Sequence, residues 1–273
     1  MKAIQRDGAN ISYQVSGQGD ITLLFVHGSY IDHSYWKKQV SFFSQDYTVV
    51  TLDLPGHGQS GTERKNWSVR GFADDVVALI RALDLRNVIL IGHSLGAGIC
   101  LMAATTYPTP IIGFIAVEFF RNAGQPLSAD YQQQAATITQ QLQKDFRNTN
   151  EQYARTALLT PQTSPAIAKR IVEAYRNAYQ PMGLATTPEI FSFYKEEARL
   201  LPTLPFKLYV INVDYMPINE NALQGIAPNG YEVLHMKGTC HYPMLEHPDQ
   251  LNSLLHEAVQ EIAVGQYHGY GAH

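Results

Sequence analysis

Cysteine is scarce in this chain: Cys100 and Cys240 are the only two among 273 residues. Two widely separated thiols form neither the disulfide framework of a small secreted domain nor the paired spacing of a structural zinc site. We therefore expect both thiols to remain reduced, and we expect no metal-binding site.

Long apolar runs are also lacking. No stretch of the sequence reaches the ~20 apolar residues that a membrane-spanning helix needs. The first six residues, Met1 to Arg6, lack the apolar segment of a signal peptide. We therefore expect a soluble cytoplasmic protein without a membrane partner.

Neither sign of charge is in marked excess. The chain carries 20 Lys and Arg residues against 24 Asp and Glu, a formal net charge of −4. Nucleic-acid binding needs a clustered positive surface, so we expect no nucleic-acid partner. Hydrophobic residues make up 45% of the sequence and charged residues 16%, which is typical of a packed globular protein. The composition leaves the oligomeric state undefined.

Short apolar runs recur along the chain and predict the strands of a sheet. Ala3 to Val15 is expected to form a hairpin, because Asp7-Gly8 is a two-residue turn signal between two strand-like segments. Six further runs have the continuous hydrophobicity of strands that are buried on both faces. These expected strands are Ile21–Val26, Tyr47–Leu52, Asn87–Ile91, Ile111–Val117, Lys207–Val213 and Tyr231–Met236.

Helical patterns lie between several of these runs. Ser68 is a suitable N-cap for a helix with an apolar face. Further helices are expected over Leu95–Thr105 and Asp249–Val264. Strands that alternate with helices predict an α/β fold with a mostly parallel sheet, covered by helices on both faces.

The alternation stops between residues 119 and 201. This stretch has no convincing strand and is rich in Gln, Ala, Thr and Tyr. We interpret it as a helical cap, or lid, inserted into a core that residues 1–118 and 202–273 form. Its expected helices are Ala129–Phe146, Glu151–Leu159, Pro165–Tyr179 and Pro188–Leu200.

The pentapeptide Gly92-His93-Ser94-Leu95-Gly96 fits the pattern G-x-S-x-G. The pattern is weak alone but meaningful where a strand precedes it and a helix follows, as predicted here. The glycines leave room for a sharp turn that pushes Ser94 out of the sheet. At the helix N-terminus, backbone N–H groups and the helix dipole favour developing negative charge. Ser94 is therefore the candidate nucleophile.

A serine hydroxyl needs a base to become a nucleophile. His241 is the candidate base, because it lies between the last predicted strand and the final helix, in the chain order serine, acid, histidine. The histidine in turn needs a carboxylate that fixes its tautomer. Asp214 and Glu118 both end predicted strands, at the sheet edge where α/β proteins form their sites. Asp214 is the preferred acid, and Glu118 is the alternative.

The segment His27-Gly28-Ser29 ends the first buried strand. A loop at this place can supply a backbone N–H to an oxyanion, so we expect the N–H groups of Ser29 and Leu95 to form an oxyanion hole. We interpret His27 and His93, which flank the site, as structural hydrogen-bonding residues.

Four ordered motifs resemble the α/β-hydrolase superfamily: His27-Gly28, Leu52–Ser60, Gly92–Gly96 and Gly238–His241. The resemblance covers nearly the whole chain outside the expected cap. It implies an eight-stranded sheet whose first strands are antiparallel, a helical cap after the sixth strand and a Ser–acid–His triad.

The chain departs from the superfamily pattern around the acid. The loop before Asp214 is shortened, and Cys240 stands where members often have glycine. Ala116–Arg121 instead resembles the strand end of haloalkane dehalogenases, whose acid is a glutamate there. Those enzymes use an aspartate nucleophile, so Ser94 favours acyl transfer over dehalogenation.

Together these residues predict a cofactor-independent serine hydrolase that cleaves a small or medium carboxylic ester, a small-molecule substrate. Two alternatives use the same fold: cleavage of a thioester, lactone, amide or carbon–carbon bond, and slow turnover by a ligand-binding or signalling protein. Cap aromatics are candidates for an acyl pocket, although each alone is more typical of cap core. They are Tyr131, Tyr153, Tyr175, Tyr179, Phe191, Phe193 and Tyr194.

Overall fold

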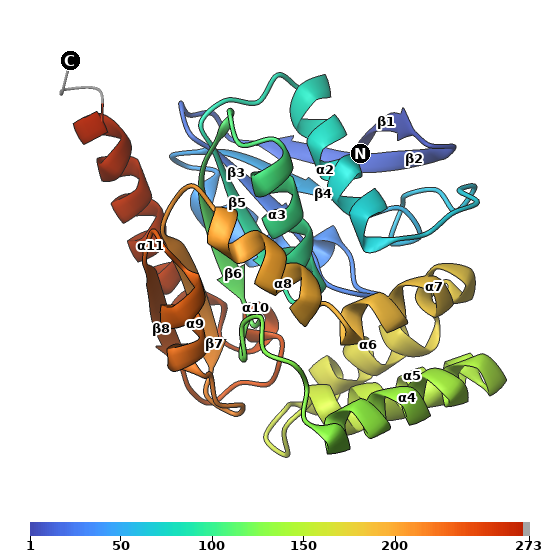
Figure 1. Ribbon diagram of the computed structural model, residues 1–273. Coiled ribbons are helices and arrows are strands. Elements are labelled where there is room, and N and C mark those ends of the chain that lie inside the picture. The colour runs from blue at the N-terminus through green and yellow to red at the C-terminus, as the bar shows by residue number, and fades with distance from the viewer. Residues whose placement is uncertain (270–273) are drawn as a thin grey trace.

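A sheet of eight strands forms the centre of the computed structural model, which describes residues 1–269 (Figure 1). The spatial order is β1-β2-β4-β3-β5-β6-β7-β8. The pairs β1–β2 and β2–β4 are antiparallel, and the other neighbouring pairs are parallel. The predicted mostly parallel, eight-stranded α/β sheet is confirmed. The strands are β1 (Lys2–Arg6), β2 (Ala9–Ser16), β3 (Thr22–Val26), β4 (Thr48–Leu52), β5 (Val88–His93), β6 (Ile111–Val117), β7 (Leu208–Val213) and β8 (Tyr231–Met236).

The N-terminal hairpin forms as the sequence predicts. Asp7 has φ +49° and Gly8 has φ +80°, the two positive values that a tight type I′ hairpin turn requires. The hairpin places β1 at one edge of the sheet and β2 against β4.

Side chains of the central strands alternate between two buried faces. In β5, Val88 and Leu90 pack on one face, whereas Ile89 and Ile91 pack on the other. Burial on both sides is the reason that these strands are apolar throughout. One face is covered by α2 (Val69–Ala82), α3 (Leu95–Thr106) and α9 (Glu220–Ile226), and the other by α1 (Lys37–Phe43) and α11 (Pro248–Gly269).

Helix α2 begins at the predicted cap. The Ser68 hydroxyl accepts the N–H of Gly71 at 2.9 Å, which satisfies one donor of the first turn. Phe72, Val76 and Ile80 lie on one side of the helix and are buried against the sheet. Capping and amphipathic spacing thus explain both where α2 starts and which face it buries.

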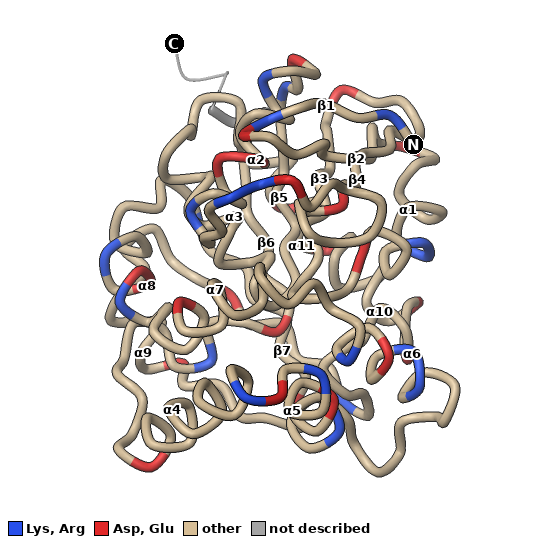
Figure 2. Tube along the Cα trace, turned by 90° about the vertical axis from the view of Figure 1, so that its right-hand side faces the viewer, with Lys and Arg blue, Asp and Glu red and all other residues tan. Residues whose placement is uncertain are grey.

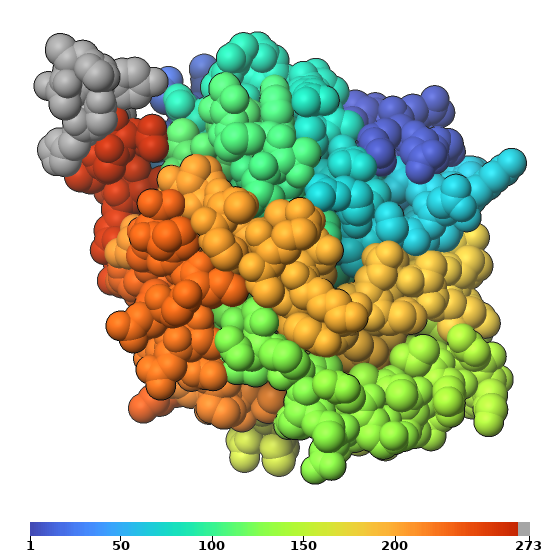
Figure 3. All heavy atoms as spheres, in the orientation of Figure 1, coloured from blue at the N-terminus to red at the C-terminus, as the bar shows by residue number. Residues whose placement is uncertain are grey.

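Five α-helices connect β6 to β7, where the sequence predicts no strand. They are α4 (Ala129–Lys144), α5 (Phe146–Tyr153), α6 (Pro165–Arg176), α7 (Gln180–Phe191) and α8 (Tyr194–Leu200), and a π-helical segment, η2 (Ala154–Leu158), follows α5 directly. In Figure 1, α4 to α7 group beyond the carboxyl ends of the strands, whereas α8 lies beside α3. Figure 3 shows the segment after β6, in green, on the surface between α8 and α9.

The sequence predicts one helix over Pro188–Leu200, but two helices cover this stretch. Helix α7 begins earlier, at Gln180, contains Pro188 in its interior and ends at Phe191, and α8 follows from Tyr194. Pro181 suits the first turn because the first N–H groups of a helix have no internal partner. Within α7 the hydroxyls of Thr186 and Thr187 donate to the carbonyls four residues earlier, at 2.9 and 2.8 Å.

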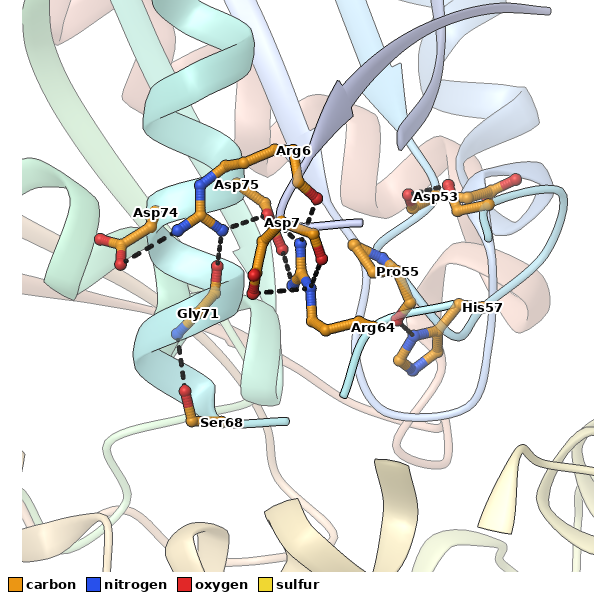
Figure 4. Close-up of polar contacts among 11 residues, drawn as sticks. Arg6, Asp7, Asp53, Pro55, His57, Arg64, Ser68, Gly71, Asp74 and Asp75 are labelled. Carbon is orange, nitrogen blue, oxygen red and sulfur yellow. Dashed lines mark hydrogen bonds and ion pairs between the residues drawn. The ribbon is translucent and has the colours of Figure 1, made fainter. Parts of the chain in front are cut away.

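A buried ion-pair cluster joins the N-terminal hairpin to α2 (Figure 4). Both carboxylate oxygens of Asp75 accept a hydrogen bond from Arg64 at 2.7 Å, and one also accepts from Arg6 at 2.6 Å. The side chains of Asp75 and Arg64 are almost completely buried. We call Arg6, Arg64 and Asp75 the hairpin cluster.

Charged residues of both signs are interspersed along the chain (Figure 2). Glu151 of α5, for example, accepts a hydrogen bond from Arg155 at 2.9 Å and another from Arg176 at 2.6 Å. Within residues 1–269, none of the helices combines the length and the hydrophobicity needed to cross a bilayer.

Candidate active site

Ser94 occupies the turn between β5 and α3, as the G-x-S-x-G pattern predicts. Its backbone has φ +53° and ψ −125°, a conformation that residues with a Cβ rarely adopt. Its N–H donates to the Val117 carbonyl of β6 at 2.9 Å, and its own carbonyl accepts the N–H of Ala97 at 2.8 Å. These bonds hold a half-buried serine at the N-terminus of a buried helix.

Three glycines make this turn sterically possible. A Cβ at Gly92 would lie 2.4 Å from the Gly96 carbonyl oxygen, and a Cβ at Gly96 would lie 2.2 Å from the Val26 carbonyl oxygen of β3. Both obstacles are backbone atoms, which cannot move aside as a side chain does. A Cβ at Gly28 would lie 3.2 Å from that of Ser94, so this glycine brings the loop after β3 against the nucleophile.

The register of the sheet brings distant parts of the chain to one edge. Val26 pairs with Gly92 across β3 and β5, and His93 pairs with Val117 across β5 and β6. The residues that follow these pairs therefore emerge side by side at the carboxyl ends of parallel strands. Ser94 and Glu118 are neighbours for this reason.

Glu118 is buried, and its carboxylate has three partners. Oε1 accepts a hydrogen bond from Nη2 of Arg121 at 2.6 Å and lies 3.2 Å from Nδ1 of His241. Oε2 accepts the backbone N–H of Val213 at 2.7 Å. A carboxylate at Nδ1 favours the tautomer that carries its proton there, which leaves Nε2 of His241 free to act as a base.

Asp214, the acid preferred from the sequence, contacts a different histidine. Its Oδ1 lies 2.9 Å from Nδ1 of His235 in β8, and its side chain is 29% exposed. This geometry corrects the expected pairing, since Glu118 and not Asp214 contacts His241. The cause is the length of β7: the strand continues to Val213 and the Asp214 N–H donates to the Met236 carbonyl at 2.8 Å. Asp214 is thereby carried past Glu118 and stays beside β8.

The backbone of His241 is held from two sides. Its N–H donates to the Leu158 carbonyl of η2 at 3.1 Å, and its carbonyl lies 2.8 Å from Nε2 of His93. Because a carbonyl only accepts, Nε2 of His93 must carry a proton. Burial lowers the pKa of His93 well below its ordinary value, so this histidine is neutral. His93 is thus a structural hydrogen-bond donor, the role that the sequence analysis gave it. The contact from Leu158 has no signal in the sequence.

His27 supports the loop that carries Ser29. Its Nε2 accepts the N–H of Leu54 at 3.0 Å, so Nδ1 carries the proton and donates to the Gly28 carbonyl at 2.8 Å. Burial lowers the pKa of His27, which keeps the ring neutral. Leu95 is the first residue of α3, and its N–H has no partner inside the helix. The two N–H groups expected at an oxyanion hole therefore belong to the first residue of α3 and to the loop after β3, which Gly28 brings against Ser94.

Tyr30 links the loop after β3 to α6 and α7. The Thr187 hydroxyl of α7 donates to the Gly183 carbonyl, so the Tyr30 hydroxyl donates to Thr187 Oγ1, at 3.1 Å. The Tyr30 ring meets Tyr175 of α6 edge-on, with 4.9 Å between ring centroids. Burial raises the pKa of Tyr30 to about 12, which keeps it a neutral donor.

The aromatic residues of the segment 119–201 that were predicted as pocket candidates have different environments. Tyr153 and Tyr175 stack with ring centroids 6.3 Å apart, on the side of Tyr30. Phe193 instead packs over α3, and Tyr131 is 58% exposed. Within this set, Tyr153 and Tyr175 are the pair that approaches the loop after β3.

In the part of the chain that the structure describes, two groups of side chains bring carboxylate oxygens or ring nitrogens within 4.8 Å of one another, the spacing of a possible metal site. In the group Asp32, His33 and Asp53, the Asp53 carboxylate already accepts the backbone N–H groups of His33 and Gln59. In the group Glu232, Glu257 and Glu261, Lys207 contacts two of the carboxylates. These contacts account for both groups, and we assign neither a metal.

The sequence matches the model of the alpha/beta hydrolase family over residues 23–254. The match spans most of the chain and includes Ser94, Glu118 and His241. The chain therefore belongs to the alpha/beta hydrolase family.

Individual relatives are more distant. The chain is 35% identical over 96 residues to (E)-2-((N-methylformamido)methylene)succinate hydrolase of Acinetobacter baylyi, which covers 35% of this chain and 36% of the relative. It is 40% identical over 94 residues to a non-heme chloroperoxidase of Streptomyces lividans, 34% of each chain. The chain thus spans about a third of the length of the curated relatives it matches.

A solved structure with the same fold covers nearly the whole chain. An esterase from Thermogutta terrifontis superposes with a TM-score of 0.79 at 18% identity, over 96% of this chain and 99% of that one. At this identity the likeness shows the shared fold.

Proposed function

We propose that this protein is a serine hydrolase that cleaves a small or medium carboxylic ester through an acyl-enzyme on Ser94. The observation that carries the proposal is the cluster at the sheet edge. Ser94 stands in a strained turn directly after His93, whose ring centroid lies 4.8 Å from that of His241. Nδ1 of His241 in turn faces Glu118 at 3.2 Å. Membership of the alpha/beta hydrolase family supports the same class of chemistry.

In the proposed mechanism, Glu118 keeps the proton of His241 on Nδ1, and Nε2 accepts the proton of the Ser94 hydroxyl. The serine oxygen bonds to the ester carbonyl carbon, and the N–H groups of Leu95 and Ser29 stabilise the resulting oxyanion. The ester C–O bond then breaks, and the imidazolium donates its proton to the leaving alcohol. Water, deprotonated by His241, attacks the acyl-enzyme, which releases the carboxylic acid and restores Ser94.

We further propose that residues 119–201 cover this site as a cap. Two contacts support this: the Leu158 carbonyl on the His241 backbone and the Thr187 hydroxyl on Tyr30. Helix α8 packs with α3 instead, because Phe193 fills the space over Gly98. The part of the cap above the substrate would therefore be α4 to α7.

Labelling with a fluorophosphonate, followed by mass mapping of the modified residue, tests the proposal without knowledge of the substrate. We expect one label per chain, on Ser94, and none in Ser94→Ala. A series of p-nitrophenyl esters of increasing acyl length, with thioester, lactone and amide substrates beside it, then identifies the bond and the acyl size. Labelling of another residue, or ester turnover that persists in Ser94→Ala, would refute the assignment.

A further inference from the structure

Besides His241 and the Val213 N–H, the Glu118 carboxylate contacts Arg121, which no sequence motif predicted. Oε1 accepts a hydrogen bond from Nη2 of Arg121 at 2.6 Å, and the same oxygen lies 3.2 Å from Nδ1 of His241. Arg121 and His241 therefore share the oxygen that would stabilise the imidazolium. The signal of Arg121 in the sequence is only its position three residues after Glu118.

We infer that Arg121 is a positioning residue of the proposed triad, which extends to lower pH the range in which His241 acts as a base. The inference rests on the proposed function. It concerns a residue that holds Glu118 and that does not itself take part in the transfer of the acyl group.

The first role of Arg121 is to keep the buried Glu118 carboxylate ionised. The Glu118 side chain is fully buried, whereas that of Arg121 is 23% exposed. A carboxylate that is removed from water and faces a neutral histidine favours its protonated form. An arginine is charged at every relevant pH and holds a carboxylate ionised when it lies at hydrogen-bond distance. Arg121 thus keeps Glu118 in the form that can bind the Nδ1 proton.

The contacts of Arg121 and Val213 also fix the orientation of the Glu118 carboxylate. The Arg121 guanidinium lies over the Tyr215 ring, 5.2 Å from the ring centroid. Val213 donates its N–H to Oε2 of Glu118, so the two carboxylate oxygens have separate partners. The carboxylate plane is therefore fixed before a substrate enters.

The other titratable groups around this pair are uncharged in the neutral range. His93 and Tyr242 pack on His241 from β5 and from the loop after β8. Burial lowers the pKa of His93 well below its ordinary value and raises the pKa of Tyr242 well above it. Burial likewise raises the pKa values of Tyr153, Tyr215 and Cys240. Arg121 is then the cation that Glu118 and His241 face.

Arg121 and the imidazole contact the same carboxylate oxygen, and a permanent positive charge this near to an imidazole opposes its protonation. Removal of Arg121 has two effects of the same sign: the imidazole gains a proton more easily, and Glu118 loses the cation that keeps it ionised. Each effect raises the pH at which activity is lost when the solution is acidified. A merely structural arginine would change the rate at every pH by the same factor.

The rate of fluorophosphonate labelling at Ser94, measured from pH 5 to pH 9, tests this inference without a substrate. In Arg121→Gln we expect the midpoint of the pH profile to rise by about one unit. Arg121→Lys keeps the charge, so its midpoint should stay within about 0.3 unit of wild type, with a lower plateau because the planar fork is lost. The matched control is Arg155→Gln, which removes an exposed arginine paired with Glu151 and should leave the profile unchanged.

Circular dichroism and thermal melting establish that each variant is folded. If Arg121→Gln does not fold, Arg121→Met keeps an apolar stem over Tyr215 and should give the same midpoint shift. Wild-type labelling at Ser94 with an unmoved midpoint in the uncharged variant would overturn this inference and leave the proposed function intact. A wild type that is never labelled at Ser94 would overturn the proposed function, and the inference with it.

Discussion

Ser94 and Glu118 share a backbone feature that is uncommon outside glycine. Both have positive φ, at +53° and +60°, and each directly follows one of two neighbouring parallel strands. Such conformations cost ~1–3 kcal/mol each and persist only where surrounding bonds hold them. The holding bonds are the Ser94 N–H to the Val117 carbonyl and the Glu118 N–H to the Ile211 carbonyl, both at 2.9 Å. The proposed mechanism uses both of these strained residues.

Substitution of the two acids separates their roles. Glu118→Gln removes the negative charge that stabilises the imidazolium of His241, so we expect kcat on an activated ester to fall on the order of 10³-fold. In Asp214→Asn the partner affected is the exposed His235, and we expect less than about a threefold change in kcat. Steady-state kinetics on both variants measures the difference. A larger loss in Asp214→Asn would show that the acid follows β7 after all.

At the scale of elements, the site depends on the close packing of the end of β3, the turn at Ser94 and the start of α3, which leaves no room for a side chain at Gly96. Val26 of β3 lies so close to the start of α3 that Gly96 cannot carry a Cβ. The π-helical η2 contributes in another way, because it presents the Leu158 carbonyl to the His241 N–H. The elements therefore position the reacting groups through their backbones as well as their side chains.

A pair of glycine substitutions tests the packing of the turn. In Gly96→Ala the new Cβ would meet the Val26 carbonyl oxygen at 2.2 Å, and we expect a loss of at least ~2 kcal/mol in the free energy of unfolding. Gly225 in α9 has no atom within 4 Å of a Cβ, so Gly225→Ala should be neutral or stabilising by up to ~1 kcal/mol. Urea unfolding of both variants makes the comparison, and equal stabilities would contradict it.

At the scale of the molecule, parallel pairing assembles residues from four places in the chain. Gly28, Ser94, Glu118 and His241 follow β3, β5, β6 and β8, and helices on both faces fix these strands. The hairpin cluster attaches the outermost part of the sheet to α2 in the same long-range manner, since Arg6 and Asp75 are 69 residues apart. A buried ion pair of this kind specifies which segments meet, and its loss leaves an unpaired charge.

The hairpin cluster predicts a large difference between two adjacent aspartates. Asp75→Ala leaves the buried Arg64 without its carboxylate, and we expect the free energy of unfolding to fall by about 3 kcal/mol or more. Asp74 is 41% exposed and 3.5 Å from Arg6, so Asp74→Ala should cost less than ~0.5 kcal/mol. Urea unfolding gives both values. Combining Arg64→Met with Asp75→Leu should recover most of the loss, and a double variant no more stable than Asp75→Ala would count against the explanation.

The sequence by itself determined the strands, the sharp turn that carries Ser94 and the order of the site residues along the chain. Buried parallel strands must be apolar throughout, a tight hairpin turn needs residues that accept positive φ, and a turn packed against backbone needs glycine. Each requirement is local, so it can be recognised in the sequence at Asp7-Gly8, Gly92 and Gly96. The same holds for the Ser68 cap of α2 and for the place of His241 after the last strand.

Only the tertiary structure decided which carboxylate meets His241. Asp214 and Glu118 both end strands, and the choice depends on how far β7 runs past β6, a matter of register between strands that are remote in sequence. The hydrogen bond from the His241 N–H to the Leu158 carbonyl likewise joins residues that are remote in sequence. A local pattern records what a residue needs from its immediate neighbours in the chain. The partners of a buried charge are set by the packing of the whole molecule.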